Sequence, residues 1–176
     1  MKLTLKDFPT DAVMDLVQKL RRAARDAREG ELQSVALSSP TGSGKTVMAA
    51  AAIETLLVGD ADHKPNPQTT FLWITDQLDL NEQTRRKMLE TSVALGPSNV
   101  VVIDTSFDQE TFSSGVLYFL NTQKLSKVAN LTTHGDERSF TFWETVANTV
   151  RERPGNFYVF IDEAHRGMSE SAAKQK

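Results

Sequence analysis

The feature that most constrains this chain is the segment Ser-Pro-Thr-Gly-Ser-Gly-Lys-Thr, which occupies residues 39–46. It follows a short apolar run at 35–37 and opens an alanine-rich helical pattern from Val47 to Val58. Glycines between a strand and a helix let backbone N–H groups curl around phosphate oxygens, and the helix start adds its positive dipole end. The segment therefore predicts a phosphate-binding P-loop, whereas the plainer alternative is an ordinary turn that contains glycines.

The residue types in this loop suit a nucleotide with its magnesium ion. Lys45 supplies a positive charge for the β- and γ-phosphates, and the hydroxyl of Thr46 can ligate Mg²⁺. Ser39 stands where the P-loop pattern usually has glycine. We therefore expect ATP and Mg²⁺ as cofactors, with further phosphate contacts from Pro40, Thr41, Gly42, Ser43 and Gly44.

An acidic pair follows the last apolar run of the chain. Residues 157–161 predict a strand, and Asp162 and Glu163 come directly after it. Ligands of open α/β sheets bind at the carboxyl ends of the strands. We expect Asp162 to hold Mg²⁺ and Glu163 to orient or deprotonate the water that attacks the γ-phosphate. The alternative is a solvated turn.

The remainder of the chain alternates between strand and helix patterns. Alternation of this kind predicts an α/β fold in which a mainly parallel sheet is covered by helices on both faces. Asp79 and Glu82 resemble a capping box, and Phe142 and Trp143 are expected to pack in the core. Further strands are predicted at 70–75, 100–103 and 116–120, and helices at 10–29, 79–88 and 142–150.

Composition limits the class of protein. The chain has 176 residues, of which 39% are hydrophobic and 24% charged, which is typical of one soluble globular domain. It has no cysteine, which excludes disulfides and thiolate metal sites and fits a cytoplasmic location. We find no signal peptide and no apolar run of transmembrane length. The net charge of −3 predicts that any contact with nucleic acid is local.

The two nucleotide motifs together resemble motifs I and II of superfamily 2 DEAD/DEAH-box helicases and translocases. The run from Phe160 to Arg166 is most similar to the restriction subunits of type III restriction enzymes. The resemblance implies a RecA-like domain that couples ATP hydrolysis to movement along DNA, with RNA as the alternative track. It implies that His165 links the nucleotide to other motifs. Residues 71–75 and 121–125 look like the motifs that contact the nucleic-acid backbone, which implies contacts from Thr75, Gln77, Gln83 and Lys124.

Three departures from the family pattern are visible. Pro9 follows Phe8 where the family often has the glutamine that reads adenine. Asp76-Gln77-Leu78 replaces a Pro-Thr-Arg, which removes a phosphate-binding arginine. The chain ends soon after His165, so motif III and a second RecA-like domain are not in it. We therefore expect residues 1–176 to be an N-terminal RecA-like ATP-binding domain truncated after motif II, with a leading amphipathic helix (1–32) and a P-loop core (33–176).

The resemblance also predicts the layout of the sheet. In RecA-like motors another strand lies between the P-loop strand and the strand that ends in the acidic motif. The segments 35–38 and 159–161 should then lie about 9–10 Å apart, twice the spacing of paired strands. Direct pairing, at about 4.8 Å, would instead indicate a small-molecule P-loop kinase. A third alternative is a non-catalytic remnant that binds nucleotide or a partner. The expected partners are the second RecA-like domain and a modification or specificity subunit.

Overall fold

Four apolar runs of the chain pair side by side as a parallel sheet in the order β2-β3-β1-β4. The strands are β1 (Thr70–Thr75), β2 (Val100–Val102), β3 (Leu117–Asn121) and β4 (Phe157–Ile161). The computed structural model describes residues 1–2, 7–40, 42–125, 131–134 and 138–162. The predicted α/β class is confirmed.

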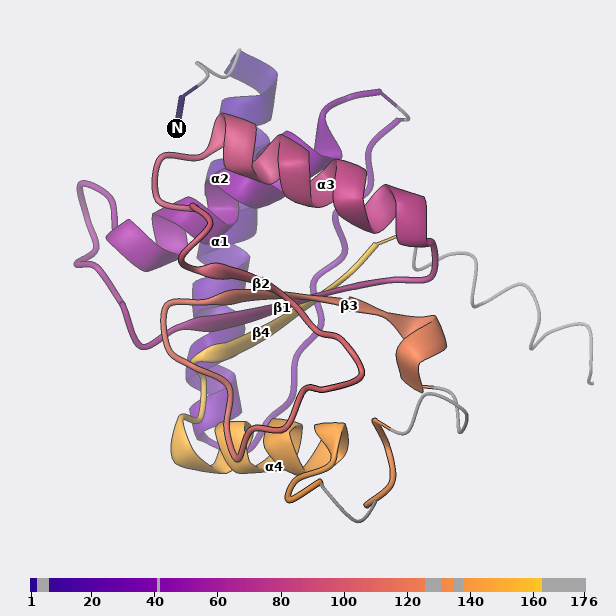
Figure 1. The fold of residues 1–176 in the computed structure, drawn as a ribbon. Coiled ribbons are helices and arrows are strands. Elements are labelled where there is room, and N and C mark those ends of the chain that lie inside the picture. Colours follow the sequence, from indigo (N-terminus) through magenta and orange to yellow (C-terminus); the bar gives the residue numbers. More distant parts are fainter. Residues whose placement is uncertain (3–6, 41, 126–130, 135–137, 163–176) are drawn as a thin grey trace, which may run out of the picture.

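Helices cover both faces of this sheet (Figure 1). One face carries α1 (Asp7–Arg28), α2 (Lys45–Val58) and α3 (Leu78–Thr91). The other face carries α4 (Phe142–Glu152), and a short 3-10 helix, η1 (Thr122–Leu125), follows β3. None of the helices in the described ranges is long and apolar enough to cross a membrane.

The side chains of the sheet fall into two cores. We call the first the upper core; it joins α1, α2 and α3 to the sheet through residues such as Leu16, Ile53 and Phe71. The second, the lower core, joins α4 and the loop after β2 to the sheet through residues such as Phe112 and Phe142. Because parallel strands are buried on both faces, β1 and β3 are almost wholly enclosed.

The predicted P-loop strand is wrong. Residues 31–40 form no strand, and in the described part of the chain β4 pairs with β1 alone. A strand needs a ladder of hydrogen bonds to a neighbour. Segment 32–39 instead lies across a cavity from β4, and both line it. The alternative of direct pairing, as in a kinase, is therefore not what the structure has.

Two other expectations are corrected. Helix α3 begins after Gln77, which makes no side-chain cap, and Glu82 pairs with Arg85 rather than with the start of the helix. The capping box occurs in α4 instead, between Thr141 and Glu144.

The predicted burial of the aromatic pair is half right. Phe142 is fully buried, but Trp143 is 54% exposed. Helix α4 is rotated so that Thr145 and Thr149 face the loop after β2, where they bond to the backbone of Gln109 and Phe112. Buried hydrogen bonds thus determine which side of α4 faces the protein.

Candidate functional site

The P-loop segment adopts the backbone that its glycines allow. Gly42 and Gly44 have φ angles of 80° and 87°, in the left-handed region that favours glycine. Gly44 is the N-cap of α2, and no acidic residue lies in the first turn. The N-terminus of this helix therefore presents backbone N–H groups and a positive dipole end to an anion. Thr41 lies outside the described residues.

Lys45 is held by the loop itself. Its Nζ donates to the carbonyl oxygens of Ser39, at 2.9 Å, and Pro40, at 3.2 Å. The hydroxyl of Ser39, the departure from the glycine pattern, donates to the hydroxyl of Ser43 at 2.5 Å. A glycine at position 39 could not make the bond to Ser43, whereas the bond from Lys45 to the carbonyl of residue 39 needs no side chain there.

Asp162 is placed by the end of β4. Its backbone N–H donates to the carbonyl of Ile74 at 2.9 Å, so the pairing with β1 continues one residue past the strand. Side chains alternate between the faces of a strand. Tyr158 and Phe160 belong to the upper core, so Asp162 continues on that face. Glu163 and His165 lie outside the described residues.

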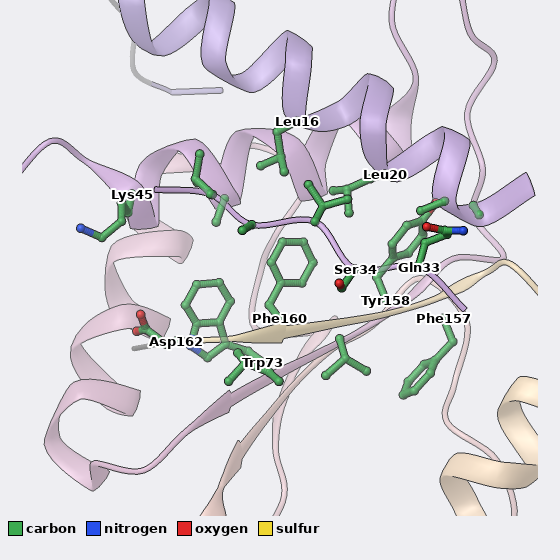
Figure 2. Close-up of a pocket in the computed structure, with 18 of the residues that line it drawn as sticks. Leu16, Leu20, Gln33, Ser34, Lys45, Trp73, Phe157, Tyr158, Phe160 and Asp162 are labelled. Atoms are coloured by element: carbon green, nitrogen blue, oxygen red, sulfur yellow. The ribbon is translucent and has the colours of Figure 1, made fainter. Parts of the chain in front are cut away.

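These groups meet at one end of a cavity of about 780 Å³. Lys45 and Asp162 lie at that end, where Trp73 stands beside Asp162 (Figure 2). The interior of the cavity is mainly apolar, formed by α1, by segment 32–39 and by β4. Burial raises the pKa of Tyr158 in this wall, against the charges of Arg28 and Arg21, which lower it. The phenol therefore stays neutral at pH 7.

The oxygen atoms at this end of the cavity are suitable ligands for a Mg²⁺ ion that is also bound to a phosphate. Thr46, at the second position of α2, and Asp162 both line the cavity. Among the described residues no group of three or more His, Cys, Asp and Glu could hold a metal ion. Mg²⁺ commonly takes one or two protein ligands and completes its shell with phosphate and water. Two oxygen ligands beside a phosphate site are sufficient for that ion.

The expected nucleic-acid residues differ in how accessible they are. Thr75 is 2% exposed, and its hydroxyl accepts from the backbone of Gln77. Gln77 is half-buried and Gln83 is exposed. The ammonium of Lys124 donates to the carbonyl of Ile103 at 2.7 Å. Thr75 is the last residue of β1, Gln77 and Gln83 come after β1, and Lys124 comes after β3. Of these four residues, only the two glutamines present free polar surface.

Sequence reasoning missed Trp73 and the apolar wall provided by α1. Alternation along 70–75 could have placed Trp73 on the same face as the helices, because Phe71 and Trp73 both belong to the upper core. The position of α1 over the cavity has no local signal. It follows from packing of Leu16 and Leu20 opposite β4 (Figure 2).

Comparison with known proteins agrees with these motifs. The model of the family described as "Type III restriction enzyme, res subunit" matches residues 2–175. No curated protein matches the chain, and no solved structure does. The match spans nearly the whole chain and supports a helicase-like ATP-binding domain. The chain therefore belongs to the family of type III restriction enzyme res subunits.

Proposed function

We propose that this chain is the ATP- and Mg²⁺-binding half of a DNA-acting helicase or translocase motor, working in a restriction system. One observation carries the proposal. The start of α2, with Lys45 and Thr46, and the end of β4, with Asp162, lie at the same end of one cavity (Figure 2). Lys45 and Thr46 thus line the same cavity as Asp162, more than a hundred positions away in the sequence, which supports a shared nucleotide site.

Each residue has a defined role in this proposal. The backbone from Pro40 to Thr46 wraps the phosphates, and Lys45 leaves its loop carbonyls to bind the β- and γ-phosphates. Thr46 and Asp162 hold Mg²⁺, which neutralises charge on the phosphates when it is bound. Glu163 orients or deprotonates the attacking water, and His165 relays the state of the site to the nucleic-acid side.

The partners belong to the same proposal. The res subunit family acts in DNA restriction, so DNA is the proposed track, contacted first by Gln77 and Gln83 at the carboxyl edge of the sheet. A second RecA-like domain would close over the nucleotide, and a modification or specificity subunit would select the DNA site. A cytoplasmic location, where DNA and ATP are available, is part of the same proposal.

The test is the removal of the P-loop ammonium. Lys45→Ala should weaken the binding of a fluorescent ATP analogue about tenfold or more, because it removes charge-assisted hydrogen bonds to phosphate. Lys64→Ala, which removes an exposed lysine from the loop after α2, is the matched control. Equal affinity of Lys45→Ala and the wild type, with both folded by circular dichroism, would refute the nucleotide site.

A further inference from the structure

The indole nitrogen of Trp73 is buried without a hydrogen-bond partner. Trp73 lies in β1 and is 5% exposed, and its Nε1–H finds no acceptor in the described structure. Nearly all buried donors in proteins are paired, because an unpaired one loses its bond to water and gains nothing in return. The position of this donor therefore calls for an explanation.

The ring of Trp73 is fixed in place by its neighbours. It stacks on Phe160 with 5.8 Å between the ring centroids and 14° between the planes. It also contacts Phe119 at 6.2 Å. A phenylalanine could make similar stacking contacts without an unpaired donor. In this arrangement the described residues offer the Nε1–H no acceptor.

The ring also forms part of the wall of the cavity, at the end that holds Lys45 and Asp162 (Figure 2). Trp73 pairs with Phe160 in the β1–β4 register, which places it diagonally opposite Asp162 on the same face. Diagonal neighbours of this kind are within reach of an aromatic side chain. Because Nε1 is buried, an acceptor held inside the site reaches it only by displacing the side chains that cover it at this end of the cavity.

We propose that the Trp73 indole N–H donates a hydrogen bond to an anionic oxygen of the phosphate chain bound at this end of the cavity. The inference rests on the proposed nucleotide site and adds to it a neutral donor from β1. Phosphate oxygens are acceptors without a competing proton, so they suit a lone N–H donor. Trp73 is thus a phosphate-binding residue that the P-loop and acidic motifs do not include.

The indole N–H can be observed directly by NMR. The chain has two tryptophans, and Trp143 is exposed, so Trp143→Phe leaves one indole cross-peak in a ¹⁵N-labelled protein. Adding Mg²⁺ with a non-hydrolysable ATP analogue should move the Trp73 cross-peak downfield, as expected for a new hydrogen bond. Inorganic triphosphate should give the same shift, and adenosine should give none. Replacing Trp73 with benzothienylalanine, which keeps the ring shape without the N–H, should weaken binding about tenfold.

The outcomes separate this inference from the function on which it rests. If a fluorescent ATP analogue binds but the cross-peak does not move, the inference is overturned and the nucleotide site stands. If no nucleotide binds to the wild type, both fall. In the Asp162→Asn variant with nucleotide bound, the Trp73 cross-peak should still shift. If it does not, the acceptor of the indole N–H is the Asp162 carboxylate rather than the phosphate, and the inference is overturned.

Discussion

Glu54 shows how a single charged residue can anchor several elements. Glu54 is 8% exposed and lies in α2, beside the loop that follows α3. It accepts hydrogen bonds from the N-terminal ammonium, from the Ser92 hydroxyl and from the backbone N–H groups of Val93 and Ala94. Burial raises the pKa of Glu54, but these donors outweigh it, so its pKa lies below the ordinary value of 4.5.

We expect Glu54→Gln to lower the free energy of unfolding by about 1–3 kcal/mol at pH 7, because it removes the charge that these donors surround. Urea unfolding measures this. A carboxyl whose folded pKa is lowered contributes stability above its unfolded pKa and loses that contribution as the pH falls through the folded value. The difference between wild type and variant should therefore shrink below about pH 4.5.

The control for this prediction is an exposed glutamate. Glu90 in α3 pairs with Arg86 at 3.8 Å, and both side chains are exposed. Glu90→Gln should change stability by no more than about 0.5 kcal/mol. If Glu54→Gln lowers the free energy of unfolding no more than Glu90→Gln does, the buried carboxylate does not stabilise the fold.

At the scale of elements, α4 is defined by its caps and its threonines. The backbone N–H of Thr141 donates to Glu144 at 2.8 Å, and the Thr141 hydroxyl accepts from the Glu144 N–H at 3.3 Å. Along the helix, Thr149 accepts from Phe112 at 2.9 Å, and Asn148 donates to the carbonyl of Glu110 at 3.1 Å. These polar bonds fix α4 against the loop after β2 and leave Trp143 and Val150 exposed.

We expect Thr141→Ala to cost about 1 kcal/mol of stability, since it removes the cap that binds the Glu144 N–H. Asp79→Ala is the matched comparison, because Asp79 lies in the first turn of α3 without capping it. Asp79→Ala should lower the free energy of unfolding by only a few tenths of a kcal/mol, which is about what a negative charge contributes at the start of a helix. Thermal unfolding compares the two, and equal losses would contradict the different helix starts seen here.

At the scale of the whole molecule, β4 is an edge strand: within the described ranges no strand pairs with its outer edge. Val159 is 47% exposed and Ile161 is 63% exposed. Their side chains alternate with those of the upper core, so they lie on the face that α4 covers only in part. An unpaired strand edge with exposed apolar residues is a surface for association.

We therefore expect the chain to self-associate with rising concentration, and Ile161→Lys to reduce this because an edge charge opposes strand pairing. Sedimentation velocity over a concentration series tests the prediction. Met14→Lys is the control, since Met14 is 66% exposed but lies in α1, away from the edge. If both variants reduce self-association equally, the association depends on exposed apolar side chains in general and not on the edge of β4.

The composition of the cavity also predicts slow chemistry. Lys45 is the single cationic residue among the described residues that line it. A charge-stabilising arginine in related nucleotide hydrolases is worth about 10³–10⁵ in rate. ATP turnover by residues 1–176 alone should thus stay near background in a phosphate-release assay, with or without DNA. Turnover at helicase-like rates would show that these residues hold the whole catalytic machinery.

What the sequence by itself determined was mostly local. Glycines at 42 and 44 dictate the turn before α2, because their backbone angles depend on neighbouring atoms alone. The apolar runs at 70–75 and 157–161 became β1 and β4 with the predicted bounds. The end of β4 then placed Asp162 at the edge where α/β sheets bind ligands.

The tertiary structure decided what depends on distant partners. Residues 35–38 read as a strand but have no ladder, because the edge of β4 lies across a cavity from them. Lys124 was expected to contact the phosphate backbone of nucleic acid, yet its ammonium donates to the carbonyl of Ile103, 21 positions away in the chain. Trp73 could be placed on a strand, but its unpaired N–H emerged only from the packing of Phe160 and Phe119 around it. Strand pairing and burial are set by residues far apart in sequence, and no local pattern encodes them.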